Sequence, residues 1–422
     1  MDAVIKQKGG VFFLHGYGGT GKTYMWRTLA SALRSKHEIC LTVATSGITS
    51  LLLPGGRIAH SKFKLPVPCV EKSTCKINFN DPSVGLLREA KLIIWDEAPM
   101  AHKYCFETLD RTLKDVMSNY SNSKTIFGGK VVIFGGDFRQ ILPVVPGGSR
   151  SDIVHSTINA SYIWHYVKIG EGRISEPNDG YANIDIPPEL LITDFDDPIL
   201  AIVESTYPDF LNCYQSCDYL KNRAILASTL DIVDTINDHV LAMMPEIHDS
   251  NILQVLSPKF LSSLRTSGLP NHHLKLKVGT PIMLMRNIDQ SQGLCNGTRL
   301  IVTKMAAHVL EAKLMGDNNN GKVIYIPRMD MSPSQSPWPF KLSRHQFPVI
   351  VAYAMTINKS QGQSLDWVGL YIPQDVFIHG QIYVAVSRVT TKRGIKILIH
   401  DDKNIPKLST CNVVYKEVFN NI

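Results

Sequence analysis

The chain has 422 residues, 44% of them hydrophobic, which is enough for two or more packed domains that each bury a core. The formal net charge of +7 is modest but uneven: residues 171–210 carry ten acidic side chains and one basic, whereas residues 259–304 carry seven basic and one acidic. No stretch reaches the roughly 18 to 20 apolar residues of a membrane helix, and the opening MDAVIKQKGG lacks the apolar segment of a signal peptide, so neither membrane insertion nor secretion is expected.

The first 150 residues alternate short apolar runs with helical patterns, which is typical of a parallel sheet with helices on both faces. The runs that predict buried strands are Val11–His15, Ile39–Ala44, Lys91–Trp95 and Val131–Phe134. Between the last two, apolar residues recur at three- and four-residue spacing from Phe106 to Tyr120, which predicts a helix packed against the sheet. We expect residues 1–165 to form one α/β domain.

A glycine-rich segment, Gly16-Tyr-Gly-Gly-Thr-Gly-Lys-Thr23, follows the first predicted strand and opens a helix, which is the context that a phosphate-binding P-loop requires. Glycines let backbone N–H groups approach a chain of phosphates, and the helix start adds its positive end. Lys22 is expected to hold the β- and γ-phosphates and to act in catalysis, and Thr23 to hold a Mg²⁺ ion. The residues expected to bind the nucleotide are Gly16, Gly18, Gly19, Thr20, Gly21, Lys22 and Thr23. A glycine-rich turn without a ligand is the alternative.

Two further polar segments follow predicted strands. Asp96 and Glu97 end the third strand, where Asp96 can hold Mg²⁺ with Thr23 and Glu97 can orient or deprotonate an attacking water. Gly135-Gly-Asp-Phe-Arg-Gln140 ends the fourth strand and would bring Gln140 to the γ-phosphate as a polar sensor. Considered alone, the carboxylate pair could be two solvent-exposed surface residues. The second segment could be a loop that turns on its glycines.

Beyond residue 165 the pattern changes three times. Residues 166–210 are acidic and rich in proline, which favours a solvated connector. A second α/β domain is expected over 211–267 and 346–422, with strands at Arg223–Ala227, Val349–Ala354, Val368–Ile372 and Ile395–Ile399 and a helix with Leu230, Val233, Ile236 and Val240 on one side. Residues 268–345 carry β-rich runs at Pro281–Met285, Thr298–Thr303 and Lys322–Ile326 and a turn at Asp317–Gly321, which predict a small inserted β domain, a barrel-like form or a sheet, with the barrel-like form favoured.

The charge and the cysteines narrow the class of protein. The basic surplus suits a polyanion such as nucleic acid, although on its own it more often marks a solvated face. The eight cysteines contain no C-x-x-C pair, so neither a zinc module nor a disulfide framework is indicated. Reduced thiols are typical of an intracellular protein, and that is the expectation here.

With these motifs assembled, the chain resembles helicases of the Pif (petite integration frequency) family of superfamily one, in its plant and Helitron-transposon branch. The resemblance covers nearly the whole chain. It rests on HGYGGTGKT (15–23), ATSGITSLLLPGGRIAHS (44–61), IIWDEAPM (93–100), GGDFRQILPV (135–144), LKLKVGTPIMLMRNIDQSQGLCNGTRLIV (274–302), AMTINKSQGQSL (354–365) and HGQIYVAVSRV (379–389).

The resemblance implies two RecA-like P-loop domains and ATP-driven movement along single-stranded DNA from 5′ to 3′, with unwinding of duplex or folded DNA. The residues that it places on the DNA strand are Thr45, Ser46, His60, Ser61 and Lys359. Gln361 would contact the nucleotide and couple it to DNA, and Arg388 would reach the γ-phosphate as an arginine finger. Judged without the family, Lys359–Gly362 is a polar loop and Arg388 a cation at a helix end.

The chain departs from the family pattern at three places. A glutamine-bearing helix that reads adenine precedes the P-loop in relatives, and Gln7 has no matching context. Relatives carry a Leu-Thr-x-Asn-Met-Arg segment, whose arginine is a first finger, where this chain passes directly from Lys168 to Ile169. Ser228 and Leu230 stand where relatives usually have Pro and Asn, which leaves that DNA contact open.

Three functions compete at this point. An ATP-dependent DNA helicase is favoured, with roles in DNA repair, recombination and telomere maintenance and a nuclear or, as the alternative, mitochondrial location. A transposon-derived copy that binds ATP and DNA with little turnover would explain the missing arginine. A P-loop ATPase that acts on protein is disfavoured by the segments 44–61 and 354–365.

Overall fold

The computed structural model describes residues 2–5, 8–78, 81–120, 124–169, 181–245, 268–315, 321–333 and 342–419. The chain divides into two compact units. Unit 1 comprises residues 1–183, 377–384 and 411–422, and unit 2 comprises residues 184–376 and 385–410. The segments 377–384 and 411–422 therefore group with unit 1, whereas the sequence pattern assigned all of 346–422 to the second domain.

Several features of the sequence analysis lie outside the described residues. These are Gln7, residues 170–180 of the acidic stretch, residues 246–267 of the second domain and residues 317–320 of the expected turn.

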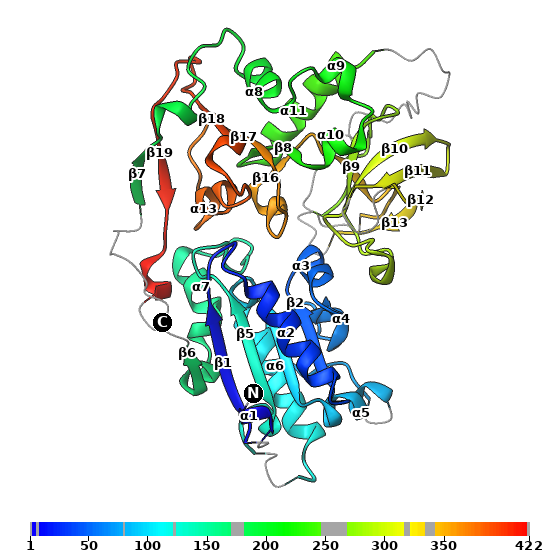
Figure 1. The fold of residues 1–422 in the computed structure, drawn as a ribbon, viewed down its shortest axis with the longest axis vertical. Helices are drawn as coiled ribbons and strands as arrows, with labels where there is room; N and C mark the ends of the chain where they lie inside the picture. The colour runs from blue at the N-terminus through cyan, green and yellow to red at the C-terminus, as the bar shows by residue number, and fades with distance from the viewer. Residues whose placement is uncertain are drawn as a thin grey trace. The chain divides into compact units, whose positions relative to one another are not determined.

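A parallel sheet forms the centre of unit 1, as the sequence predicted (Figure 1). Its strand order is β3-β2-β4-β5-β1-β6, and each neighbouring pair runs parallel. The strands are β1 (Gly10–His15), β2 (Cys40–Ala44), β3 (Arg57–Ile58), β4 (Leu92–Asp96), β5 (Val131–Gly136) and β6 (Val167–Ile169). Four of them lie within two residues of the predicted strands.

Helices cover both faces of this sheet, because alternate residues of each strand point to opposite sides. The helices of unit 1 are α1 (Asp2–Ile5), α2 (Lys22–Arg34), α3 (Gly47–Leu52), α4 (Ala59–Lys62), α5 (Pro82–Glu89), α6 (Lys103–Val116) and α7 (Arg150–Ser156). On one face, Trp26 of α2 packs in a cluster with Ile94 of β4. On the other face, the ring of Trp95 lies 4.7 Å from that of Phe106 on α6. Burying one such large side chain contributes roughly 1.5–3 kcal/mol.

The α6 helix follows its predicted periodicity. Phe106, Leu109 and Leu113 are fully buried at three- and four-residue spacing. Tyr120, which the pattern added to the same face, is 50% exposed beyond the end of the helix. The α/β interpretation of the first domain is confirmed by the parallel sheet and its helices.

Unit 2 contains a second parallel sheet, of order β16-β8-β17-β18. Its strands are β8 (Arg223–Ala227), β16 (Ala354–Thr356), β17 (Trp367–Ile372) and β18 (Ile395–Ile399). The helices before or after β8 are α8 (Pro198–Thr206), α9 (Phe210–Cys213), α10 (Cys217–Lys221) and α11 (Leu230–Met243). The helix α13 (Gln381–Val386) follows β17 in sequence, and its first four residues group with unit 1. None of the helices in the described residues has the length and apolarity that crossing a membrane requires.

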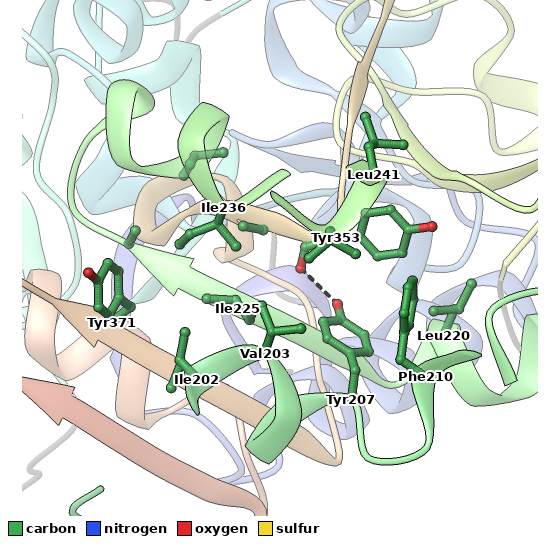
Figure 2. Packing of buried hydrophobic residues seen from close by; sticks show 14 of the residues in the cluster. Ile202, Val203, Tyr207, Phe210, Leu220, Ile225, Ile236, Leu241, Tyr353 and Tyr371 are labelled. Atoms are coloured by element: carbon green, nitrogen blue, oxygen red, sulfur yellow. Dashed lines mark hydrogen bonds between the residues drawn. The ribbon is translucent and has the colours of Figure 1, made fainter. Parts of the chain in front are cut away.

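The core of unit 2 gathers residues from helices and strands that are far apart in sequence. Figure 2 shows Ile202 and Val203 of α8 facing Ile225 of β8. The Tyr207 hydroxyl donates a hydrogen bond to the carbonyl oxygen of Tyr353 at 2.7 Å, the dashed line in Figure 2. A buried hydroxyl without a partner would cost free energy, so this bond fixes how Tyr207 enters the core.

Part of the acidic stretch differs from the solvated connector that its prolines suggested. Residues 198–206 form α8, whose Ile202 and Val203 are completely buried. Pro198 occupies the first turn of this helix, where its missing N–H costs nothing, and Asp197 caps the helix by accepting the N–H groups of Ile199 and Leu200. A proline that begins a helix was thus taken for one that breaks it.

The inserted β residues form an antiparallel sheet of order β12-β11-β10-β9-β15. The strands are β9 (Pro281–Leu284), β10 (Arg299–Met305), β11 (Val309–Leu314), β12 (Val323–Pro327) and β15 (Val349–Val351). Two ribbons add β13 (Met329–Met331) with β14 (Arg344–Gln346), and β7 (Tyr181–Asp185) with β19 (Ser409–Val413). Among the described residues no pairing joins β12 to β15, so the sheet is open there and the barrel form is not seen.

The predicted strand Val349–Ala354 is two strands in two different sheets. Val349–Val351 is β15, which pairs with β9 of the antiparallel sheet. Ala354 begins β16, which pairs with β8 of the parallel sheet. The chain therefore leaves the inserted β sheet and enters the α/β core within one continuous apolar run, which hydrophobicity alone cannot divide.

Short 3-10 helices complete the described elements. They are η1 (Ala98–Met100), η2 (Ile126–Gly129), η3 (Ile158–Ala160), η4 (Tyr162–Tyr166), η5 (Pro188–Leu190), η6 (Gln290–Gln292), η7 (Ile357–Ser360), η8 (Lys392–Gly394) and η9 (Lys416–Phe419).

Candidate nucleotide-binding site

Three predicted motifs meet at one edge of the unit 1 sheet. The P-loop follows β1, the Asp96-Glu97 pair ends β4, and the Gly135–Gln140 segment ends β5, which lies between the other two strands. Because the three strands are parallel, their carboxyl ends lie side by side. Ligands of open α/β sheets bind at this kind of edge.

The P-loop is open to solvent and carries a cation inside it. Residues 17–21 are exposed, and the backbone reaches the left-handed region at Gly19 (φ 83°) and at Gly21 (φ 84°), which caps α2. The Lys22 ammonium donates to the carbonyl oxygens of Gly16 and Tyr17, the latter at 3.0 Å. A Cβ at Gly19 or Gly21 would meet open space, so what these positions require is the backbone angle. This loop, with its ammonium and helix start, fits a phosphate chain.

Asp96 is a buried carboxylate beside that cation. Its side chain is 3% exposed and accepts the N–H of Glu97 at 3.1 Å. Burial raises the pKa of Asp96, and the positive charge of Lys22 opposes that rise. A nearby cation stabilises the ionised form of a buried carboxylate. Asp96 and Thr23, at the start of α2, also offer oxygen ligands of the kind that Mg²⁺ prefers.

Glu97 leaves the strand at a sharp turn. Its φ of 52° places it in the left-handed region, which is uncommon for a residue with a Cβ and recurs at functional sites. The side chain is 9% exposed. Glu97 therefore follows β4 directly, at the sheet edge that carries the phosphate motifs.

Glycines let β5 approach its neighbours closely. A Cβ on Gly135 would overlap the Trp26 ring and lie 3.0 Å from Oδ1 of Asp96. A Cβ on Gly136 would overlap Pro99. Gln140 is 3% exposed, and its N–H donates to the Asp137 carbonyl at 3.1 Å.

A polar network that the motif analysis did not single out surrounds Asp137. Its carboxylate accepts the Tyr383 hydroxyl at 2.6 Å and the N–H of Arg139 at 2.9 Å, and lies 3.5 Å from Nε2 of His15. Burial raises the pKa of Asp137, but hydrogen bonds from His15, Tyr383 and Arg139 outweigh it and hold the pKa below its ordinary value. Tyr383 lies in the segment 379–389, on which the family resemblance partly rests. The presence of one polar residue in each of two motifs, Asp137 and Tyr383, was the sequence signal that could have pointed to this contact.

His379 anchors the same segment. Its Nδ1 accepts the N–H of Tyr415 at 2.7 Å, which leaves Nε2 as the donor to the Phe138 carbonyl at 2.8 Å. Burial lowers the pKa of His379 to about 4. The ring is thus held neutral, in one tautomer, against the Gly135–Gln140 segment.

The expected DNA residues of unit 1 divide into two groups. Thr45 and Ser46 follow β2, and the N–H of Thr45 donates to the Asp96 carbonyl at 3.1 Å, so they lie at the same sheet edge as the phosphate motifs. Thr45 accepts the indole N–H of Trp95, and Ser46 caps α3. His60 and Ser61 lie on α4, where Ser61 is exposed and His60 is half-buried.

The remaining candidates lie in unit 2. Lys359 is in η7, directly after β16, and its ammonium donates to Oδ1 of Asn296 at 3.0 Å. Burial lowers the pKa of Lys359, and the charge of Arg286 adds to this. Gln361 is 5% exposed, and Arg388 is 6% exposed, with its guanidinium donating to the Gln363 carbonyl at 3.2 Å. The structure thus brings Arg388 to the loop that holds Lys359 and Gln361.

Two models of known protein families match parts of the chain. Residues 1–172 match the family described as PIF1-like helicase, and residues 259–305 match the DNA helicase Pif1 2B domain. These two matches together span just over half of the chain. By these matches the chain resembles the PIF1-like helicases.

Curated PIF1 helicases are similar to this chain along nearly all of its length. The ATP-dependent DNA helicase PIF1 of Danio rerio is 25% identical over 99% of this chain, which spans 63% of that relative. The Homo sapiens protein is 26% identical over 95% of this chain, which spans 60% of it. The Pif1 of Campylobacter jejuni is 24% identical over 91% of this chain and 88% of its own length.

Solved Pif1 structures share the fold. Bacteroides Pif1 bound to single-stranded DNA gives a TM-score of 0.59 at 24% identity, over 93% of this chain and 89% of that one. Bacteroides Pif1 in complex with ADP-AlF3 and single-stranded DNA gives 0.61 at 24% identity, over 94% and 90%. The Pif1 of Candida albicans gives 0.59 at 21% identity, over 99% and 96%. At these identities the likeness establishes the fold.

Proposed function

We propose that this chain is an ATP-dependent DNA helicase that moves along single-stranded DNA from 5′ to 3′ and unwinds duplex or folded DNA. The observation that carries the proposal is the joint edge of β1, β4 and β5, with the Lys22 ammonium in an open P-loop beside the buried Asp96. The names of the relatives, ATP-dependent DNA helicases, support the same activity.

In this proposal each residue at the edge has one task. The P-loop N–H groups and Lys22 bind the triphosphate, and Glu97 orients or deprotonates the attacking water while Gln140 senses the γ-phosphate. Thr23 and Asp96 would hold Mg²⁺, which supplies charge neutralisation between the β- and γ-phosphates when bound. Burial already raises the pKa of Asp96, so a cation there also lowers the cost of keeping its carboxylate ionised.

The DNA side of the proposal rests on position and on the relatives. Thr45 and Ser46 share the sheet edge with the phosphate motifs, so a strand held there would be sensitive to the nucleotide. Structures of Bacteroides Pif1 contain single-stranded DNA. We further propose that the chain belongs to the plant and Helitron branch and acts in genome maintenance. Its location would be nuclear or mitochondrial.

The test is DNA-stimulated ATP hydrolysis by the Glu97→Gln variant. Loss of the carboxylate should leave ATP binding intact and lower turnover by roughly 10²- to 10⁴-fold, the contribution of a general base. Glu89→Gln, which changes an exposed carboxylate of the same unit, is the matched control and should behave as the wild type. Equal turnover in the wild type and Glu97→Gln would remove Glu97 from the mechanism, and wild-type turnover indifferent to single-stranded DNA would contradict the helicase.

A second candidate is a copy that binds ATP and DNA with little turnover. The direct passage from Lys168 to Ile169, where the family carries its first arginine finger, favours it. The same assay separates the two, because such a copy would bind both ligands and show no stimulated hydrolysis.

A further inference from the structure

Three side chains with soft donor atoms meet in unit 1, away from the phosphate motifs. His60 lies on α4, Cys69 on the segment after it, and Cys105 in the first turn of α6. Their ligand atoms all lie within 4.8 Å of one another, and they form the one such group among the described residues. They are separated by up to 45 positions in the sequence, so no short sequence motif predicts that they meet.

One distance between these atoms is that of a tetrahedral zinc site, and the others are at most 4.8 Å. Nε2 of His60 lies 3.7 Å from Sγ of Cys105. Zinc bonds of about 2.3 Å to sulfur and 2.0–2.1 Å to nitrogen put tetrahedral ligand atoms about 3.5–3.8 Å apart. An ion therefore fits between these side chains with small adjustments of their positions.

Hydrogen bonds fix the backbone of Cys105 and fasten the segment that carries Cys69 to α6. The N–H of Cys105 donates to the His102 carbonyl at 2.8 Å as α6 begins. Farther along the segment that carries Cys69, Arg111 of α6 donates to the Ser73 carbonyl at 2.9 Å, and the N–H of Cys75 donates to Oγ1 of Thr112 at 2.9 Å. The segment is thus fastened to α6 without the metal, which lowers the ordering cost of binding.

We propose that His60, Cys69 and Cys105 bind one Zn²⁺ ion and thereby cross-link α4, the 63–78 segment and α6. Thiolate and imidazole ligands select zinc over magnesium, and three protein ligands leave the fourth tetrahedral position to water. The ion would occupy Nε2 of His60, so the ring would be fixed by zinc and could not use that atom on a DNA strand. Ser61, the next residue on α4, would be positioned by the same ion.

The test measures zinc in the full chain. The purified, reduced protein is incubated with Zn²⁺, passed through a desalting column and analysed by mass spectrometry for metal content. The wild type should retain about one equivalent, and Cys69→Ser and Cys105→Ser should each lose it. Cys213→Ser, which changes a half-buried thiol of unit 2, should retain it.

A second measurement requires no variant. Co²⁺ in place of Zn²⁺ should give the wild type a thiolate-to-cobalt charge-transfer absorption with tetrahedral visible bands, and added Zn²⁺ should raise its thermal unfolding temperature. A folded, reduced wild type that retains no zinc would overturn the proposal. So would zinc retained equally by Cys69→Ser and Cys105→Ser, or a Cys69–Cys105 disulfide in the protein as purified without reductant.

Discussion

Gly380 shows how a single residue holds a motif in place. Its φ is 75°, and a Cβ there would overlap the carbonyl oxygen of Arg139 and lie 3.0 Å from the carbonyl carbon of Gln140. The positive φ favours glycine, and the close approach of two backbones requires it. The segment that carries His379 and Tyr383 can thus lie directly against the Gly135–Gln140 segment.

Gly380→Ala should therefore destabilise unit 1. The left-handed backbone and the overlap together should cost about 2–4 kcal/mol of unfolding free energy. Gly147→Ala is the matched control, since Gly147 has φ 70° in the same unit with no atom within 4 Å of the added Cβ. It should cost about 1–2 kcal/mol. Denaturant unfolding of both variants checks this, and equal losses would show that the overlap relaxes without cost.

At the scale of elements, His379 makes the packing of the 377–384 segment dependent on pH. Nδ1 can accept the N–H of Tyr415 only while it is unprotonated. Burial is the largest influence that lowers the pKa of His379 to about 4, Arg150 acts in the same direction, and Asp137 and Glu417 act against it. The folded ring thus takes up a proton later than the unfolded ring as the pH falls.

Stability should fall between about pH 6.5 and pH 4 for this reason. In that window the unfolded chain binds more protons at His379 than the folded chain, so the unfolding free energy decreases by up to about 3 kcal/mol as the pH falls. Urea unfolding at several pH values measures the slope. His379→Gln should be less stable at neutral pH and show a shallower slope, and identical slopes would exclude His379 as its source.

Strands and motifs were predictable from the sequence because their signals are local. The P-loop and Asp96-Glu97 follow apolar runs, and parallel topology then places them at one edge; their catalytic roles stay predictions. The division of Val349–Ala354 between two sheets depends on partners, β9 and β8, that the run itself does not specify. The meeting of Cys69 with Cys105 has no local signal for the same reason, since these residues form no C-x-x-C pair and come together only where the 63–78 segment packs against α6.

At the scale of the whole molecule, counting charges overstates the basic surface. Arg299 is 5% exposed, and its guanidinium donates to carbonyl oxygens that include those of Lys221 at 3.0 Å and Ala352 at 3.2 Å. Lys277 donates to the carbonyls of Leu241 and Met244. These cations of the 259–304 stretch stabilise the connections between the β insertion and the α/β core of unit 2, so only part of the surplus is available to a polyanion.

The last prediction concerns turnover by the chain as it stands. The family resemblance assigns two arginines to the γ-phosphate, and this sequence offers Arg388 for one of them and passes from Lys168 to Ile169 where the other belongs. An arginine at a transferring phosphoryl group contributes roughly 10³ to 10⁵ in rate. Compared with a helicase that carries both arginines, we expect the chain to bind ATP and single-stranded DNA but to hydrolyse ATP far more slowly and to unwind DNA less.

Insertion of a segment containing Leu-Thr-x-Asn-Met-Arg between Lys168 and Ile169 should then raise DNA-stimulated turnover by orders of magnitude. The same insertion with alanine in place of its arginine is the control, because it restores chain length at the edge strand β6 without restoring the charge. Thermal unfolding of both insertions separates a catalytic gain from a gain in stability, since a stabilising insertion would raise the activity of the alanine version equally. Brisk hydrolysis by the unmodified chain would show that Arg388 suffices or that another cation takes the missing place.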